Sequence, residues 1–296
     1  MTSEVALLVN PSAGRGRGAR AGRIAASTLR DRGHRVRELV GRSGDEAADL
    51  AAAALSAGTD GLVVVGGDGM VHLALQQMAG PGAPGVPLGV VPAGTGNDVA
   101  RYLGVPRRDP AAAAAVVADG HMRQMDLARA GGVYYATVLA SGFDSTVNER
   151  ANAMTWPRGQ MRYNLATAAE MRTFRPVRYA LELDGRRLDV EAMLVAVGNG
   201  PSYGGGLRIC EGAKLDDGLL DVVVIKPLSR LSLLRVYPLL FTGAHVRLPQ
   251  YEHHHATRVS LAAPGISAYA DGERLGALPL TVESAPRAVT VFVARP

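Results

Sequence analysis

The sequence predicts an α/β domain followed by a mainly antiparallel β domain. In residues 1–126, short and almost continuous apolar runs alternate with helical patterns, which is typical of a parallel sheet covered by helices on both faces. In residues 127–296, short β patterns predominate, and residues 177–184 alternate apolar with polar side chains. The length of 296 residues is sufficient for two domains of ordinary size.

The elements of the first domain alternate along the chain. Strand patterns cover residues 5–9, 36–40, 61–65 and 88–91, and helical patterns cover residues 19–32, 45–58 and 71–79. A further helix begins at Asn97, and the alanine run 111–115 is also predicted to be helical because alanine favours helix.

The second domain contains two helical patterns among its strands. The β patterns cover residues 134–139, 177–184, 192–197, 220–225, 258–261, 280–283 and 289–293. The helical patterns cover residues 161–174 and 231–242. Val177, Tyr179 and Leu181 alternate with smaller or polar residues, which places one face of that strand in a core and the other in water.

Composition limits the classes of protein to which the chain could belong. The formal net charge of +5 comes almost entirely from arginine and would attract nucleotides or an anionic membrane surface. Cys210 is the only cysteine, which excludes an intrachain disulfide and favours a reducing cytoplasm. No apolar run approaches the roughly 20 residues of a membrane span, and the N-terminus lacks a signal-peptide pattern. Any membrane contact is therefore expected to be peripheral.

The first chemical motif is Gly66-Gly67-Asp68-Gly69, which follows an apolar strand and precedes a helix. A strand that ends in glycines at a helix N-terminus aims backbone N–H groups at a common point, where they can bind phosphate. Asp68 is suitably placed to hold Mg²⁺ or to order the loop. By itself the segment could equally be a tight turn whose glycines serve only unusual backbone angles.

A second glycine loop, Ala93-Gly94-Thr95-Gly96-Asn97-Asp98, follows the next strand. Loops after consecutive parallel strands lie side by side at the carboxyl edge of the sheet, where open α/β sheets bind ligands. Asn97 or Asp98 could also be an ordinary N-cap. A third segment runs from Asn10 to Arg15, and neither it nor its surroundings matches a Walker A loop or a dinucleotide fingerprint.

Two further segments in the second domain carry carboxylates. The segment from Lys214 through Asp217 to Leu219 offers oxygen ligands to a hard cation such as Mg²⁺, although the segment by itself favours a β-turn built on Asp217-Gly218. Asp271-Gly272-Glu273 resembles a hairpin turn that could present a carboxylate.

Taken in order, these segments resemble the bacterial members of the diacylglycerol kinase catalytic-domain family, which includes sphingosine and ceramide kinases and is distantly similar to NAD kinases. The resemblance covers the whole chain and also includes Asp126 and Ser141-Gly142-Phe143-Asp144. It implies a Rossmann-like nucleotide domain over residues 1–126, a β-sandwich over residues 127–296, and an active site in the cleft between them.

The resemblance also implies a role for individual residues in an ATP-dependent transfer of phosphate to a lipid hydroxyl. ATP would be bound by Asn10, Gly66, Gly67, Asp68, Gly69, Met70, Val71, His72, Gly94, Thr95 and Asn97. Asp68, Asp98 and Asp126 would place the catalytic Mg²⁺ and the phosphates, and Glu273 would be the general base. Arg15 and Arg101 would lie near the substrate. Asp217, with the carbonyls of Lys214 and Leu219, would hold a structural Mg²⁺.

The chain departs from the family pattern at two positions. Met70 and Val40 stand where threonine is usual, which puts the fine contacts of the nucleotide in doubt but not the carboxylates. The acceptor is expected to be a diacylglycerol-like or sphingoid lipid at the inner face of the membrane, with a homodimer possible and no nucleic-acid partner. The alternatives are a kinase of a soluble hydroxyl compound, as NAD kinases are, and a nucleotide-binding regulator without turnover.

Three other features receive no functional assignment. The run Glu252-His253-His254-His255 is predicted to be a surface loop, because adjacent residues of a strand would point to opposite faces and converge poorly on one metal. Trp156 could touch lipid or be a half-buried packing residue. The helix at 161–172 could face a membrane or pack Leu165, Ala168 and Ala169 on the β domain.

Overall fold

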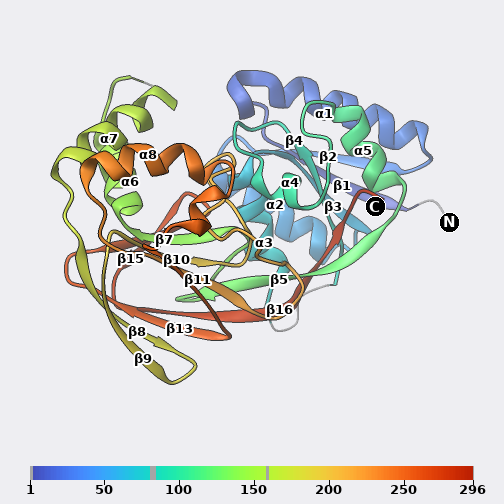
Figure 1. Ribbon diagram of the computed structural model, residues 1–296. Coiled ribbons are helices and arrows are strands. Elements are labelled where there is room, and N and C mark those ends of the chain that lie inside the picture. Colours follow the sequence, from blue (N-terminus) through green and yellow to red (C-terminus); the bar gives the residue numbers. More distant parts are fainter. Residues whose placement is uncertain (1–2, 81–84, 158–159, 296) are drawn as a thin grey trace. The chain divides into compact units, whose positions relative to one another are not determined.

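The computed structural model describes residues 3–80, 85–157 and 160–295 and divides into two compact units. The first unit contains the residues up to Leu127 together with the segment from Ala285 onward, and the second is Ala128–Ser284. Figure 1 colours them along the chain. The C-terminal segment, which the sequence analysis assigned to the second domain, clusters with the first unit because Val291 pairs with Leu88 in a parallel ladder.

The first unit is built on a parallel sheet in the order β2-β1-β3-β4. These strands are β1 (Glu4–Val9), β2 (Arg35–Val40), β3 (Gly61–Gly66) and β4 (Leu88–Pro92). Every residue of β3 and β4 is buried, as the continuous apolar runs predict for strands covered on both faces. β2 forms the edge and is largely exposed.

Helices cover this sheet in two packed pairs (Figure 1). α1 (Ala13–Asp31) packs against α5 (Pro110–Ala118), and α2 (Gly44–Ser56) packs against α3 (Asp68–Met78). The short α4 (Asp98–Tyr102) follows the second glycine loop. The caps follow from the sequence: the hydroxyl of Ser43 accepts a bond from Glu46 N, and Asp109 caps α5 ahead of Pro110.

The second unit contains two antiparallel layers that share one core. The first layer has the order β12-β11-β10-β7-β14-β15, and the second contains β16-β13-β8-β9. Their bounds are β7 (Val138–Gly142), β8 (Val177–Leu183), β9 (Arg186–Ala192), β10 (Leu194–Gly198), β11 (Leu220–Ile225), β12 (Tyr251–Ala256), β13 (Arg258–Ala262), β14 (Ser267–Ala270), β15 (Glu273–Ala277) and β16 (Leu280–Phe292). Tyr179, Val195 and Val259 belong to the shared core, which confirms the predicted sandwich.

Three predictions needed correction, and the first is the strand over residues 134–139, which divides between β6 (Val133–Tyr135) and β7. The strands expected at residues 280–283 and 289–293 are parts of the single strand β16, which ends at Phe292, although Pro286 lies inside it and Arg287 has a φ of 51°. Residues 252–255 lie in β12 rather than in a surface loop. β5 (Met122–Ala130) and β6 (Val133–Tyr135) form an antiparallel pair.

The helices of the second unit include one that the sequence analysis did not predict. This is α6 (Phe143–Ala153), which packs on α7 (Gln160–Thr173), while α8 (Arg230–Leu240) leads into the short η1 (Ala244–Arg247). α7 buries Ala166, whereas Leu165, for which packing on the β domain was one of two alternatives, is 45% exposed. The side chain of Trp156 is not half-buried, since the residue is 78% exposed. Among the described residues, no helix combines the length and apolar character needed to cross a membrane.

The hairpin between β8 and β9 turns on Asp184-Gly185, both with positive φ. The Asp184 carboxylate accepts bonds from the backbone N–H of Thr257 at 3.0 Å and of Arg258 at 2.8 Å. These bonds, chiefly the one from Thr257, lower the pKa of Asp184 below its usual range. The carboxylate thus ties this turn to the start of β13.

Replacing Asp184 by Asn should lower the free energy of unfolding at neutral pH by roughly 1 kcal/mol, because charge-assisted bonds weaken while Asn still tolerates positive φ. Since the folded-state pKa is depressed, the contribution is present above about pH 3.9 and is lost as the pH falls through the folded-state value. Urea unfolding of the wild type and Asp184→Asn from pH 7 to pH 2 measures this. Asp189→Asn on the exposed strand β9 is the control, and a difference that persists at pH 2 would contradict the explanation.

Candidate functional site

The first glycine loop lies between β3 and α3. Gly66 is the last residue of β3, and Gly67 is the N-cap of α3. A Cβ on Gly66 would lie 2.4 Å from Cγ of Met70, so Met70 packs where a side chain at Gly66 would stand. Met70 is buried, so the residue that stands where threonine is usual in the family packs its side chain against Gly66.

The two glycine loops are in direct backbone contact. Gly66 O accepts bonds from Ala93 N at 2.7 Å and Gly94 N at 3.2 Å. A Cβ on Gly94 would lie 2.4 Å from Cα of Gly67, a distance that no side chain could tolerate. The predicted side-by-side placement of these loops at the carboxyl edge of the sheet is confirmed.

The side chains of Asn97 and Asp68 hold the second glycine loop through hydrogen bonds to its backbone and to the start of α4. The Asn97 side chain accepts a bond from Gly94 N at 3.0 Å and donates one to Gly94 O at 3.0 Å. Asn97 stands at the N-cap position of α4 in the left-handed region but makes no side-chain cap. The cap comes instead from Asp68, whose Oδ1 accepts bonds from Asp98 N at 2.7 Å and Val99 N at 3.2 Å.

The buried Asp98 forms an ion pair with Arg101 on the same short helix. Arg101 also donates a bond to Gly96 O at 3.4 Å. The guanidinium of Arg101 is therefore held beside the second glycine loop, with part of its charge balanced by Asp98.

The segment after β1 completes this group of loops. Asn10 N donates a bond to Val65 O at 3.0 Å, and the Asn10 side chain accepts one from Ser12 N at 3.1 Å. Gly14, Arg15 and Gly16 all have positive φ, so the first turn of α1 is not helical. A Cβ on Gly14 would lie 2.1 Å from Ala93 O, which places this turn against the second loop.

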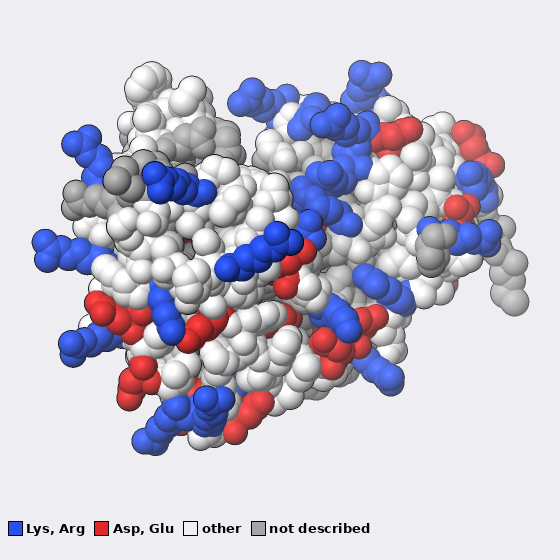
Figure 2. Space-filling view, in the orientation of Figure 1, with Lys and Arg blue, Asp and Glu red and all other residues white. Residues whose placement is uncertain are grey.

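Arg17 is a site residue that the sequence analysis missed. Its guanidinium donates bonds to Gly14 O at 2.9 Å and to Gly94 O at 3.2 Å, linking two of the three segments. No sequence signal distinguishes it, because α1 carries arginines at several other positions. Figure 2 shows Lys and Arg side chains gathered over the region of α1.

The remaining nucleotide residues differ in exposure. Gly69 and Thr95 are exposed, as is Arg15 in the turn of α1, while His72 is half-buried. Val71 is 2% exposed and faces the core, so only its backbone could contact a ligand.

Asp126 lies in β5 and is 2% exposed. One of its carboxylate oxygens accepts a bond from Arg287 N at 2.6 Å, at the point where β16 takes up positive φ. This contact gives Asp126 a role in supporting the irregular strand, whatever else it binds.

In the second unit, Glu273 is the first residue of β15 and is exposed. The preceding Asp271 and Gly272 have φ of 51° and 89°, so the predicted hairpin turn is confirmed. The Asp271 carboxylate accepts bonds from Thr137 N at 3.0 Å and Ala136 N at 3.2 Å. These bonds hold the turn and thereby fix the backbone from which Glu273 projects.

The segment 214–219 forms an irregular turn before β11. Asp217 Oδ1 accepts a bond from Leu219 N at 3.0 Å, and Gly218 has a φ of 77°. Lys214 and Asp217 are exposed. The turn that the sequence allowed is therefore present, and its carboxylate and carbonyl oxygens are ligands that suit a hard cation.

Asp144, at the start of α6, is a second residue whose properties were not predicted. Desolvation by burial raises the pKa of Asp144 to about 7. The charge of Asp144 adds to burial in raising the pKa of Tyr237 on α8. A carboxyl group that titrates near neutral pH can exchange a proton under physiological conditions.

Comparison with known proteins agrees with this architecture. Residues 4–130 match the diacylglycerol kinase catalytic domain, and residues 137–293 match the YegS C-terminal NAD kinase beta sandwich-like domain. A diacylglycerol kinase of Mycobacterium tuberculosis is 44% identical over 98% of this chain and 94% of its own length. A diacylglycerol kinase of Bacillus subtilis is 29% identical over 74% of this chain and 73% of its own length.

Solved structures share the fold. A putative diacylglycerol kinase from Bacillus anthracis str. Sterne has a TM-score of 0.84 with 24% identity, covering 99% of this chain and 95% of that one. An NAD kinase from Archaeoglobus fulgidus, solved with ATP, has a TM-score of 0.54 with 13% identity, covering 99% of this chain and 93% of that one. With domains, relatives and fold in agreement, the chain belongs to the diacylglycerol kinase family of lipid kinases.

Proposed function

We propose that this protein is an ATP-dependent lipid kinase that transfers the γ-phosphate of ATP to a hydroxyl of a diacylglycerol-like or sphingoid lipid. The observation that carries the proposal is the backbone contact between the loops that contain Gly67 and Gly94. Two loops that meet without side chains at the carboxyl edge of a parallel sheet leave their peptide groups close to a ligand.

The phosphates of ATP are expected at the N-terminus of α3 beside the second loop. The first turn of a helix carries N–H groups that its own carbonyls cannot satisfy, and the helix dipole adds positive potential there. Asn10, Gly66 to His72, Gly94, Thr95 and Asn97 form this nucleotide set in the proposal. Arg15 and Arg101 supply positive charge near the transferred phosphate or the acceptor.

Mg²⁺ is the expected metal because the donors offered are carboxylate and carbonyl oxygens. Asp68, Asp98 and Asp126 form the carboxylate set for the catalytic ion, and Asp217 with Lys214 O and Leu219 O forms the set for a structural ion. When bound, the catalytic ion would neutralise charge on the phosphates. The chain's own part is to orient these carboxylates, which the bonds of Asp68 and Asp126 to backbone N–H groups already do.

Glu273 is proposed as the general base. The acceptor oxygen forms a bond to the γ-phosphorus, the bond from that phosphorus to the oxygen bridging the β- and γ-phosphates breaks, and the hydroxyl proton passes to the Glu273 carboxylate. ADP leaves with the bridging oxygen. Such a reaction depends more on positioning and charge than on covalent catalysis.

The lipid acceptor is the part of the proposal that depends most on the relatives, several of which are named diacylglycerol kinase. We propose that the protein acts from the cytoplasm at the inner face of the membrane, because a lipid hydroxyl is presented there. The positive net charge favours approach to an anionic surface. There are two alternatives to this function. The protein would phosphorylate a soluble alcohol instead of a lipid, or it would bind a nucleotide without transferring phosphate.

The decisive assay supplies γ-labelled ATP with vesicles that contain diacylglycerol or a sphingoid base, and in parallel with NAD and soluble alcohols. Label should appear only in lipid, and Glu273→Gln should reduce turnover by about 10²–10⁴-fold while ATP binding is kept. Glu191→Gln, an exposed carboxylate on β9, is the matched control. Label in a soluble alcohol alone would refute the lipid acceptor. Full turnover of Glu273→Gln would exclude Glu273 as the general base.

The two roles of Asp68 can be separated by two substitutions. Asp68→Asn keeps an oxygen that can cap Asp98 N and Val99 N but removes the charge, whereas Asp68→Ala removes both. If the charge serves Mg²⁺, both variants should lose turnover by at least about 10²-fold, and only Asp68→Ala should lose stability, by about 1 kcal/mol. Turnover and thermal unfolding measure this. If Asp68→Asn kept full turnover, capping of α4 would be the only role left for the Asp68 side chain.

The loop contact itself can be tested with Gly94→Ala. The added Cβ would meet Cα of Gly67 at 2.4 Å, so the loops must separate and ATP affinity should fall by about tenfold or more. Gly44→Ala is the control, because its Cβ would meet no atom within 4 Å. ATP titration followed by calorimetry checks both variants, and unchanged affinity in Gly94→Ala would place the nucleotide elsewhere.

A further inference from the structure

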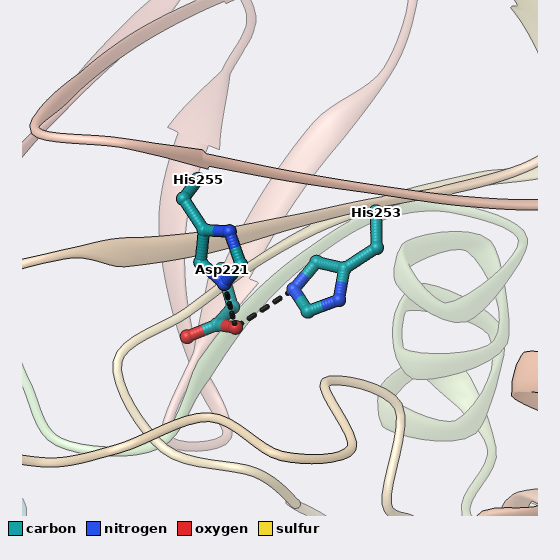
Figure 3. Close-up of side chains that lie close together, drawn as sticks. All are labelled: Asp221, His253 and His255. Carbon is teal, nitrogen blue, oxygen red and sulfur yellow. Dashed lines mark hydrogen bonds and ion pairs between the residues drawn. The ribbon is translucent and has the colours of Figure 1, made fainter.

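Asp221, His253 and His255 converge on the first sheet of the second unit, and none of them has a part in the proposed transfer. Figure 3 shows both imidazole rings directed at the same carboxylate oxygen. His253 Nε2 lies 2.7 Å and His255 Nε2 lies 3.3 Å from Asp221 Oδ1. One ligand atom from each of the three side chains lies within 4.8 Å of the others.

Strand register explains why these side chains meet. Asp221 pairs with His255 and Val223 pairs with His253 across β11 and β12. Residues two apart in a strand share a face, so His253 and His255 stand on the side of Asp221, while His254 points to the other side. The expected surface loop was wrong because His253 and His255, which are separated by one residue, share a face of β12 even though adjacent histidines do not.

Among the described residues, only one of the two carboxylate oxygens of Asp221 has a hydrogen-bond partner. Its side chain is only 2% exposed, and within the described part of the chain its Oδ2 has no hydrogen-bond partner. A buried carboxylate oxygen without a partner is costly and rare in native structures. The two imidazoles both approach Oδ1 and leave Oδ2 without a partner among the residues described, whereas the charge of a cation bound by the carboxylate would offset the cost of burying its negative charge.

We propose that Asp221, His253 and His255 bind one divalent first-row transition-metal ion, with Zn²⁺ as the representative. Two imidazole nitrogens and one carboxylate oxygen suit such ions, whereas Mg²⁺ prefers oxygen ligands throughout. Ligand atoms around a tetrahedral Zn²⁺ lie about 3.3 Å apart, given bond lengths near 2.0–2.1 Å. The separation of 3.3 Å between His255 Nε2 and Asp221 Oδ1 already has this value, and the separation of 2.7 Å between His253 Nε2 and the same oxygen would lengthen on binding.

The three side chains differ in exposure, so a bound ion would be held by a buried ligand and could still be reached from solvent. Asp221 is enclosed, the His253 side chain is 23% exposed, and that of His255 is 54% exposed. An ion can therefore enter from the side of His255, and a fourth coordination position is available to water. Because its ligands come from β11 and β12, the ion would join these two strands.

The test uses protein without a histidine tag, stripped with a chelator and titrated with Zn²⁺ against a chromophoric chelator. One equivalent should bind per chain, and binding should persist in a large excess of Mg²⁺. Co²⁺ substitution should give the absorption bands of a tetrahedral site. Binding well below one equivalent, or displacement by Mg²⁺, would refute the proposal.

Three variants identify the ligands. His255→Ala and His253→Ala should each weaken Zn²⁺ binding by about tenfold or more. His254→Ala, on the same strand but the opposite face, should bind as the wild type does. Zn²⁺ should raise the melting temperature of His255→Ala less than it raises that of the wild type and of His254→Ala.

Equal affinity in His255→Ala and the wild type would overturn the assignment. Because His255 is the most exposed of the three, its replacement leaves the core intact, and circular dichroism of the metal-free variant verifies this. The measurement needs neither ATP nor lipid, so its result is independent of the proposed transfer.

Discussion

The contact between Gly67 and Gly94 is the constraint on which the first unit depends. Their backbones approach so closely that a methyl group on Gly94 would be excluded. This contact sets the spacing of the loops after β3 and β4. Asp68 is thereby brought within reach of the N-terminus of α4, and the turn at Gly14 can rest against Ala93. Three segments that are distant in sequence form one surface because two glycines permit their backbones to meet.

The sequence predicted those features that are encoded locally. Apolar runs identified β3 and β4, and the glycines that follow them identified the loops. The same holds for the hairpin at Asp271-Gly272, since both residues tolerate positive φ. Where a few neighbouring residues decide the conformation, composition and spacing were sufficient.

Features that depend on distant partners could not be predicted. Asp68 caps a helix thirty positions further along the chain, and Arg17 reaches a carbonyl of the second loop; neither relation leaves a pattern in the sequence. β16 continues through Pro286 because its neighbours, including the carboxylate of Asp126, support the irregular backbone. The pairing of His253 and His255 with Asp221 likewise needs the register of β11 and β12.

The carbonyl groups around the glycine loops give the site a definite polarity. Gly66 O accepts two backbone bonds, Gly94 O accepts bonds from Asn97 and Arg17, and Gly14 O accepts another bond from Arg17. The negative ends of these peptide dipoles are therefore matched by the protein itself. A cation at these loops would therefore have to bind the carboxylates of Asp68 and Asp98, because the carbonyl oxygens of the three glycines already accept hydrogen bonds.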